Sequence, residues 1–430
     1  MWRWVCLGFW VVAIGFLGYL WGPVPGHAQP AKGERGGAVE PRKDSTASAP
    51  PAQIGGALAG ARPVIEAIRF PTLQAAFDAL PPEGGLVRLP AGVFEITEPL
   101  YVRAGDVCIE GAGTATHIKN LNEAGQPALV LEHPEGAKNR KTELWRVRLA
   151  NFRITGNAKS GHGIEALRIN ELFIDGVTVS YHGGAGIRLY YCYEDPRICD
   201  SLITYNKGTG LELIGCHDIV VSANQFEENQ DALRCFDGFN LTMTGNNLDD
   251  HLGDGVVIEN TYGSVVSGNM IEECQGTAIV LDRDCYGITL SANVIAHNGG
   301  GIDLRDAHGC AVSANTFVLM KANAVRIGRA SGRIAVTGNS FCDSYIGEGK
   351  MRRRPEDVQA AGMVLAGASH VATSGNVFSG VRPKALALEG GQPVRGVLFC
   401  NNVLTDVESD HPKLKKTEGA VVADNAASSQ

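Results

Sequence analysis

The sequence is poor in aromatic residues, has no excess of basic residues and contains only one long apolar run. Aromatic side chains make up 7% of the 430 residues, and the formal net charge is −8 at pH 7. A protein that binds nucleic acid through its phosphates needs a basic surface, so this composition argues against a nucleic-acid partner. Beyond position 28 no long apolar stretch occurs, which excludes a domain with several membrane-spanning helices.

Cysteines are present but form no CxxC pair, so a zinc-ribbon site is excluded. The cysteines beyond position 28 are even in number, which permits disulfides in an exported chain, with Cys192 and Cys199 as the best pair. The same residues also suit an interior in which free cysteine packs as a small apolar side chain. Both interpretations stay open at this stage.

Glycine, in contrast, is abundant. The chain has 54 glycines, about 13% against the ~7% of an average protein. Each glycine inside a helix costs about 1 kcal/mol, so long helices and coiled coils are excluded. Hydrophobic residues reach 44%, which is enough to build a core.

The N-terminal segment, 1–28, has the pattern of a targeting segment. One arginine precedes an apolar run over 4–21, and Gly26 and Ala28 provide small residues for a cleavage site. We expect either a cleaved signal peptide or a retained membrane anchor over 1–28, followed by a disordered linker over 29–62. The protein is then secreted or periplasmic, or else held at the membrane by this segment alone.

A short repeat organises the rest of the chain. The fragment [ST]-[AG]-N-x-[FIVLM] recurs with its asparagines at almost constant spacing, and only the interval from Asn339 to Asn376 is much longer. Upstream, Asp200, Gly176 and Asn151 continue the spacing, which gives eleven repeats between about 145 and 405. These asparagines are Asn224, Asn246, Asn269, Asn293, Asn315, Asn339, Asn376 and, in a decayed copy, Asn402.

Each repeat has a second apolar segment seven to ten residues after its asparagine, such as GIRL (186–189) and GIDL (301–304). Both segments alternate apolar and other residues, which is the period of a half-buried strand. Two or three short strands in every repeat predict a solenoid whose coils stack strand on strand. The asparagines then form a column of turn residues, in which a left-handed backbone is tolerated and amides bond from coil to coil.

Residues 70–118 differ from the repeats and predict the beginning of the solenoid. Thr72 to Leu80 has the pattern of a short amphipathic helix, stopped by two prolines, which would cover the open core of the first coil. The order of this helix, GG-x-V-x-L-P-x-G-x-F-x-I, a strand and G-x-G resembles the start of pectin-lyase-like right-handed parallel β-helix proteins.

The resemblance covers roughly residues 70–410. It implies an all-β fold, a single-stranded right-handed parallel β-helix of about 11–12 coils with a short N-terminal capping helix. We therefore expect one β-helix domain over 63–410, followed by a flexible tail over 411–430. The resemblance also implies a role in cleaving, epimerising or binding polysaccharide. The sequence lacks the complete set of NTDG, GHG and RIK motifs of polygalacturonases, since GHG occurs alone at 161–163, and it lacks the DPHD motif of alginate epimerases, so no particular reaction is implied.

Alignment of the coils places charged residues in columns on the outer surface. The middle position of the second strand reads Glu165, Arg188, Glu212, Arg234, Val257, Val280, Asp303 and Arg326. Such alternation suits a structural ladder of ion pairs, and it equally suits a groove that holds a uronic-acid polymer. Polar residues are densest between Asp231 and Arg305. The catalytic candidates there are Asp231, His251, Asp254, Glu259, Asp282 and Asp303, and the candidates for holding substrate charge are Arg234, Arg283 and Arg305.

Three carboxylate pairs form a second cluster: 227–228, 249–250 and 272–273. They suit a solvated acidic face, a Ca²⁺ site or a catalytic acid, so Ca²⁺ is left open as a cofactor and no metal ligand is assigned. The one dense basic stretch, Arg352 to Arg354, lies in a 347–362 insertion that could overhang a groove.

These patterns lead to two hypotheses. In the first, the protein is a polysaccharide lyase, glycoside hydrolase or uronate epimerase that acts as a monomer on a polymer, which the arginines suit if it is anionic. In the second, it is a non-catalytic glycan-binding or surface-attachment protein. A surface walled in by long turns would favour catalysis, and a flat surface would favour binding.

Overall fold

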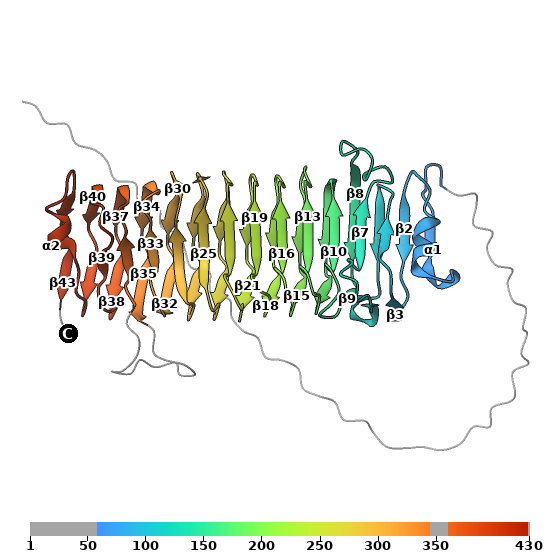
Figure 1. Cartoon of the computed structure of the whole chain (residues 1–430), viewed down its shortest axis with the longest axis horizontal. Coiled ribbons are helices and arrows are strands. Elements are labelled where there is room, and N and C mark those ends of the chain that lie inside the picture. The colour runs from blue at the N-terminus through green and yellow to red at the C-terminus, as the bar shows by residue number, and fades with distance from the viewer. Residues whose placement is uncertain (1–57, 345–359, 429–430) are drawn as a thin grey trace, which may run out of the picture. The chain divides into compact units, whose positions relative to one another are not determined.

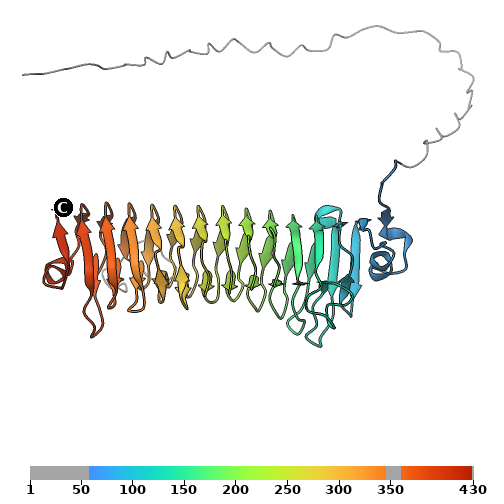
Figure 2. The same cartoon turned by 90° about the horizontal axis from the view of Figure 1, so that it is seen from above.

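The computed structural model describes residues 58–344 and 360–428. From Ala59 onward the described chain forms one compact unit. It is a right-handed parallel β-solenoid, whose strands stack side by side along the long axis (Figures 1 and 2). Every coil-to-coil strand pairing in the described residues is parallel, so the predicted fold class is confirmed.

The described strands make three sheets, A, B and C, and a typical coil contributes one strand to each. Sheet A consists of β1 (Val64–Glu66), β2 (Gly85–Arg88), β5 (Val107–Glu110), β8 (Leu144–Ala150), β11 (Ile169–Asp175), β14 (Arg197–Cys199), β17 (Val220–Ser222), β20 (Thr242–Thr244), β23 (Val265–Ser267), β26 (Cys285–Tyr286), β27 (Thr289–Ser291), β30 (Ala307–His308), β31 (Ala311–Ser313), β34 (Gly332–Thr337), β37 (Ser369–Ser374), β40 (Arg395–Cys400) and β42 (Val421–Ala423).

Sheet B consists of β3 (Gly92–Ile96), β6 (Thr116–Asn120), β9 (Arg153–Thr155), β12 (Thr178–Ser180), β15 (Leu202–Thr204), β18 (Gln225–Glu227), β21 (Asn247–Asp249), β24 (Met270–Glu272), β28 (Val294–Ala296), β32 (Thr316–Met320), β35 (Ser340–Ser344), β38 (Val377–Ser379), β41 (Val403–Thr405) and β43 (Ala426–Ser428). Sheet C consists of β4 (Leu100–Val102), β7 (Leu129–Glu132), β10 (Ile164–Leu167), β13 (Ile187–Tyr190), β16 (Leu211–Ile214), β19 (Leu233–Phe236), β22 (Val256–Glu259), β25 (Thr277–Asp282), β29 (Gly300–Leu304), β33 (Val325–Ile327), β36 (Met363–Leu365) and β39 (Leu386–Leu388).

The solenoid is longer than the repeat count of 11–12 coils. Sheet B alone has 14 strands in the described residues. The added coils lie at the two ends, where β3 and β6 precede the asparagine repeats and β43 follows them. These coils keep strands in register with their neighbours but not the [ST]-[AG]-N fragment.

Two short helices lie at opposite ends of the solenoid (Figure 1). At the N-terminal end α1 (Leu73–Asp78) follows the 3₁₀ turn η1 (Ala67–Arg69), and the Thr72 hydroxyl caps it by accepting from Ala75 N–H. Leu73, Ala76 and Phe77 join the core, so the helix covers the first coil as predicted. The remaining short helices of the described chain are η2 (Gly113–Ala115) and α2 (His411–Leu414).

The C-terminal end departs from the expectation of a flexible tail over 411–430. There α2 buries Leu414 in the core, and β42 and β43 pair with β40 and β41. The apolar end of the last long coil requires a cover, and this segment provides it. Asn425, which follows Asn402 at the spacing of the repeat, is the sequence signal that marks the extra coil.

The predicted asparagine column is a continuous hydrogen-bonded ladder between sheets A and B. The side-chain oxygen of Asn269 accepts from the backbone N–H and the amide of Asn246, at 3.0 and 2.9 Å. Its own amide donates to Asn293 at 3.0 Å and to the Met243 carbonyl at 3.2 Å. The same pattern continues to Asn425.

The left-handed residue in each of these turns is the one before the asparagine, for example Ala223 with φ 56°. Upstream, Asp200 occupies this preceding position, and Ser201 takes the place of the ladder asparagine by donating its N–H to Asn224. The ladder asparagines are therefore selected for hydrogen bonding, and the residue beside them for backbone conformation.

The core of the solenoid is apolar from end to end. Rings stack along the axis, with Phe317 and Phe341 4.9 Å apart and Phe341 and Phe378 4.5 Å apart. The ten cysteines of the described residues are free, including Cys192 and Cys199, and six of them are buried. Cysteine here therefore packs mainly as a small apolar side chain.

Some predictions fall outside the described residues, namely the targeting segment over 1–28, most of the 29–62 linker and the basic Arg352–Arg354 stretch. In the part of the chain that the structure describes, no helix is both long and apolar enough to span a membrane.

Replacement of Asn269 by leucine tests the ladder. The change removes the acceptor of two bonds from Asn246 and leaves buried donors without partners, so we expect a loss of about 1–3 kcal/mol in the free energy of unfolding. Asn425→Leu, at the half-buried end of the ladder, is the matched control and should cost less. Equal denaturant midpoints for both variants and the wild type would contradict the ladder's role.

Candidate functional site

The outer side of sheet C carries the predicted charged column in register. Strand pairing places Glu165 beside Arg188, Arg188 beside Glu212, and Glu212 beside Arg234. Farther along, Asp303 lies beside Arg326. We call the outer surface from β19 to β33 the charged face. Its charged residues are Arg234, Glu259, Asp282, Arg283, Asp303, Arg305 and Arg326.

Two valines separate the two halves of this column. Val257 and Val280 point outward with the charged residues, yet they are 3% and 0% exposed and lie outside the core cluster. The charged side chains beside them therefore cover apolar surface. In this way the face combines apolar contact with ion pairing.

The first group of charges centres on Arg234. Its guanidinium lies 3.4 Å from Asp231 and 3.8 Å from Glu259, and Arg283 lies 3.0 Å from the other oxygen of Glu259. The Arg283 guanidinium is also 5.8 Å from the ring centre of Phe236. Four of the predicted site residues thus form one network.

The second group centres on Arg305. Arg305 lies 2.9 Å from Asp303 and 3.9 Å from Asp282, and Arg326 lies 3.5 Å from Asp303. Burial lowers the pKa of Arg305, but the bond to Asp303 and the charges of Asp303, Asp254 and Asp282 more than offset this and raise it. Three predicted carboxylates therefore surround one guanidinium.

Asp231 and Asp254 also hold the backbone of the next coil. Asp231 Oδ1 accepts from the N–H of Asp254, and Asp254 Oδ1 accepts from the N–H of Thr277, both at 2.7 Å. A Cβ at Gly253 would clash with the Asp231 oxygen, so glycine is needed there. Burial raises the pKa of Asp231, which is 6% exposed.

His251 is the predicted residue that the structure removes from the site. Its side chain is 0% exposed and occupies a second buried column, in which Asn206 and Asn229 hold the equivalent positions. Its Nδ1 accepts from Asn229 N–H at 3.2 Å, as the amide oxygen of Asn229 does for Asn206. Burial lowers the pKa of His251 to about 4. The residue is therefore part of the solenoid's interior.

A depression of about 310 Å³ lies beside the second group of charges. Glycines form its floor, because the Asp231–Asp254–Thr277 column continues with Gly300. Asp303, Arg326 and Asn323 provide polar groups at its edge. Elsewhere the turns that leave the charged face are short, such as 237–241 between β19 and β20. Within the residues that the structure describes, this surface is consequently open rather than walled.

The acidic pairs form a ridge at the corner between sheets B and C. Glu227, Asp249 and Glu272 lie side by side on β18, β21 and β24. Burial, together with the charge of Asp249 and a hydrogen bond with Glu273, raises the pKa of Asp250 to about 6. Asp249, Asp250 and Glu273 have oxygens close enough together for a cation.

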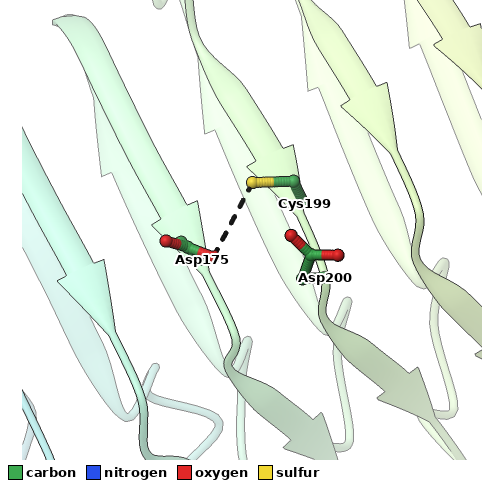
Figure 3. Close-up of side chains that lie close together, drawn as sticks. All are labelled: Asp175, Cys199 and Asp200. Atoms are coloured by element: carbon green, nitrogen blue, oxygen red, sulfur yellow. Dashed lines mark hydrogen bonds between the residues drawn. The ribbon is translucent and has the colours of Figure 1, made fainter.

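Two more clusters of possible metal ligands occur in the described residues: Asp284 with Asp306 and His308, and Asp175 with Cys199 and Asp200 (Figure 3). In the latter, Cys199 Sγ donates to Asp175 Oδ1 at 3.9 Å, and burial and the two carboxylates raise the pKa of the thiol. Asp175 also pairs with Arg148 at 2.5 Å. None of these three clusters contains a predicted catalytic residue, and Ca²⁺ stays an untested prediction.

A row of partly exposed aromatic side chains beside the charged face was not anticipated from the sequence. We call it the aromatic ladder: Tyr193, His217, Phe239, Tyr262 and Tyr286. Ring centres are 4.4 Å apart from Tyr193 to His217 and from His217 to Phe239, and 4.0 Å from Phe239 to Tyr262. The last four residues are in register as successive bridges. Tyr262 and Tyr286 are 48% and 52% exposed.

Comparison with known proteins agrees with this architecture. The family model described as right handed beta helix region matches residues 132–246 and 197–341. Together with the right-handed parallel β-helix fold, this match is consistent with the resemblance to pectin-lyase-like proteins. A comparison with curated protein sequences finds no match.

Solved structures with the same fold differ in what they do. The A-module of a mannuronan C-5 epimerase, AlgE4, from Azotobacter vinelandii is 17% identical with a TM-score of 0.56, and 76% of this chain aligns with 98% of it. The catalytic unit of an α-1,3-glucanase from Streptomyces thermodiastaticus is 17% identical with a TM-score of 0.54, over 87% of this chain and 69% of that one. PfbA, a surface adhesin of Streptococcus pneumoniae, is 12% identical with a TM-score of 0.57, over 77% of this chain and 93% of that one.

Replacement of His251 by asparagine tests whether it is structural. The unfolded chain takes up a proton near pH 6.5 that the folded chain resists to about pH 4, so His251 lowers the free energy of unfolding as pH falls through this window. His251→Asn should keep the hydrogen bond from Asn229. Between pH 7 and 4.5 its free energy of unfolding should fall by up to about 3 kcal/mol less than that of the wild type. Thermal melts at both pH values measure this.

His370→Asn, a change at an exposed histidine, serves as the control and should follow the wild type. If His251→Asn followed it as well, the assignment of the buried imidazole would be wrong.

Proposed function

We propose that the protein binds a polysaccharide chain along the aromatic ladder and the adjacent charged face. The observation that carries this proposal is the run of partly exposed aromatic rings, in register from His217 to Tyr286, parallel to a row of arginine and carboxylate side chains. Successive coils are about 4.8 Å apart, so both rows run along the solenoid axis. An elongated ligand with repeating units fits such a surface.

The exposure of the rings supports a ligand-binding role. Aromatic side chains give large apolar contact areas, and a contiguous exposed group of them marks an interaction site more often than single exposed residues do. The apolar C–H faces of sugar rings pack against aromatic rings, and the sugar hydroxyls can bond to the charged groups beside them. Tyr262 and Tyr286 are the most accessible rings of the ladder.

The charged face suits a chain that carries carboxylates. Arg283 has a side chain that is 64% exposed while one edge pairs with Glu259, so its other N–H groups can donate to a ligand's carboxylate. Arg234 and Arg305 are each shared between two carboxylates of the protein, and they hold the surface in place. An anionic polysaccharide is therefore the ligand that we propose.

Catalysis is the second candidate function, and the group around Arg305 favours it. Asp254, Asp282 and Asp303 act on one guanidinium, and Asp303 lies at the edge of the 310 Å³ depression. A lyase or epimerase needs a cation at the sugar carboxylate and a base for the neighbouring proton, and a hydrolase needs two carboxyl groups. This group contains each of these elements.

The similar structures, which include a polysaccharide-modifying enzyme, a glucanase and an adhesin, are compatible with both candidates. Export from the cytoplasm, through cleavage or retention of the 1–28 segment, and a monomeric state are further parts of this proposal. A polysaccharide ligand outside the cell accounts for the export signal.

Loss of one ring of the ladder tests the binding role. We expect Tyr262→Ala to weaken binding to mannuronan by about two- to tenfold, because an aromatic contact of this kind contributes about 0.5–1.5 kcal/mol. Affinity electrophoresis in gels containing mannuronan or neutral α-1,3-glucan measures it. Tyr181→Ala is the matched control, since Tyr181 is 53% exposed and stacks on Tyr205 at the opposite edge of sheet C.

If Tyr262→Ala kept the wild-type mobility shift in the mannuronan gel, the ladder would be removed from the binding surface. Absence of any shift for the wild type would contradict the proposed function itself.

Loss of Asp303 tests the catalytic candidate. On a polysaccharide that the protein degrades or epimerises, Asp303→Asn should lower turnover by about 10²–10⁴-fold. Its partly exposed ion pairs should contribute at most about 1 kcal/mol to stability. Glu212→Gln is the control, because Glu212 lies in the same column but pairs with Arg188 outside the group. Unchanged turnover in Asp303→Asn would leave binding as the function.

A further inference from the structure

A second candidate site lies at the N-terminal end of the aromatic ladder. It is a pocket of about 270 Å³ between the connection that leaves β7 and the turn that follows β13. The 133–143 connection projects beyond the neighbouring turns near β8 (Figure 1). The pocket's lining residues are Arg140, Glu143, Arg168, Tyr190, Tyr191 and Tyr193.

Hydrogen bonds hold the polar walls of this pocket in place. Arg168, whose side chain is 13% exposed, donates to the Gly136 carbonyl at 3.3 Å and lies 3.7 Å from Glu132. The Glu143 carboxylate accepts from the Asn170 amide at 2.9 Å. The oxygen of the same Asn170 accepts from the backbone N–H of Tyr193 at 3.3 Å. Both sides of the pocket are therefore preorganised.

The three tyrosines give the pocket an aromatic wall. Tyr190 and Tyr191 meet edge to face with ring centres 4.7 Å apart, and Tyr191 and Tyr193 are 6.2 Å apart. Tyr191 is 39% exposed, so part of its ring is available to a ligand. Tyr193 is also the first ring of the aromatic ladder, which continues to His217.

The order of these parts along the axis gives the pocket a direction. The 133–143 connection belongs to the coil of β7, Arg168 to the next coil, and the tyrosines to the coil after that. The connection therefore lies on the N-terminal side, and the ladder leaves on the C-terminal side. A chain that follows the ladder toward the N-terminus meets the 133–143 connection and ends there.

We propose that this pocket receives the terminal ring of an acidic polysaccharide, whose chain continues along the aromatic ladder. The proposal rests on the function proposed above and adds recognition of a chain end. The volume lies just below the range of about 300–1,000 Å³ that is typical of ligand pockets, so it suits one sugar ring. Arg168 pairs with Glu132, so the exposed Arg140 is the arginine of the lining that can bind a carboxylate on the ring.

Binding of a mannuronan hexamer and of long mannuronan to the full chain tests the proposal. End recognition predicts that, at equal mass of sugar, the hexamer competes more strongly than the polymer, because it presents more chain ends. Tyr191→Ala should weaken hexamer binding at least about tenfold, the factor that corresponds to about 1.4 kcal/mol. Arg140→Gln, at an exposed position, should weaken it in the same direction without removing any packed ring.

Tyr181→Ala is the matched control and should bind like the wild type. Thermal melts show whether each variant is folded. If Tyr191→Ala does not fold, Arg140→Gln still tests the pocket. End recognition would be overturned if both pocket variants bound the hexamer like the wild type, or if hexamer and polymer competed equally. Binding along the aromatic ladder would not be affected by that result. Equal binding of a neutral α-1,3-glucan hexamer would overturn the selection for an acidic ring. Failure of the wild type to bind any of these sugars would overturn the proposed function as well.

Discussion

The backbone hydrogen bonds between successive coils, supported by the asparagine ladder, are the constraint on which the rest of the structure depends. Each buried asparagine links three coils, because its oxygen accepts from the coil before and its amide donates both to the coil after and to a carbonyl of the coil before. A buried amide without these partners would cost about 1–3 kcal/mol. The ladder therefore keeps the coils in one register over most of the domain.

Register then determines the chemistry of the outer surface. Equivalent residues in successive coils are about 4.8 Å apart, so two like charges at the same position would repel each other. The column of sheet C avoids this by alternating Glu165, Arg188, Glu212 and Arg234. Asp231 and Asp254 carry like charges in adjacent coils. They are tolerated because each accepts a hydrogen bond from a backbone N–H of the coil that follows. Several site candidates are thus also parts of the scaffold.

The fold could be predicted from the sequence because a solenoid converts repeat spacing directly into strand register. The charged column follows from the same reasoning, the capping helix follows from its amphipathic pattern, and the structure has both where the sequence predicts. His251 was misassigned because its position five residues after a ladder asparagine belongs to the interior, as the equivalent Asn229 shows. The end coils, including the one with Asn425, were missed because they lack the [ST]-[AG] residues that precede the asparagine in the other repeats.

The aromatic ladder was harder to find, because it lies in the turns between sheets C and A, whose lengths vary. The turn before Tyr286 holds an extra residue at Asp284, which shifts the ring relative to the strand before it. Counting residues from the end of the strand therefore does not align Tyr286 with Tyr262, although the two residues pair in the structure. The pocket lined by Tyr190, Tyr191 and Tyr193 was still harder to predict, because it requires the 133–143 connection to lie against a turn two coils away.

Ion pairing on the charged face also separates the two candidate functions. Catalysis requires groups that converge on one point with protonation states matched to the reaction. A regular repeat instead spreads its groups evenly along the axis, and each arginine of the charged face is already paired with at least one carboxylate of the protein. Asp231 has a raised pKa, but it is buried and bonded to the backbone of the next coil. At Gly299–Gly301 the aspartate column gives way to glycine and opens a depression beside Asp303. Because side chains are missing from this column here, it is the position on the charged face where we place the proposed reaction, if the protein is catalytic.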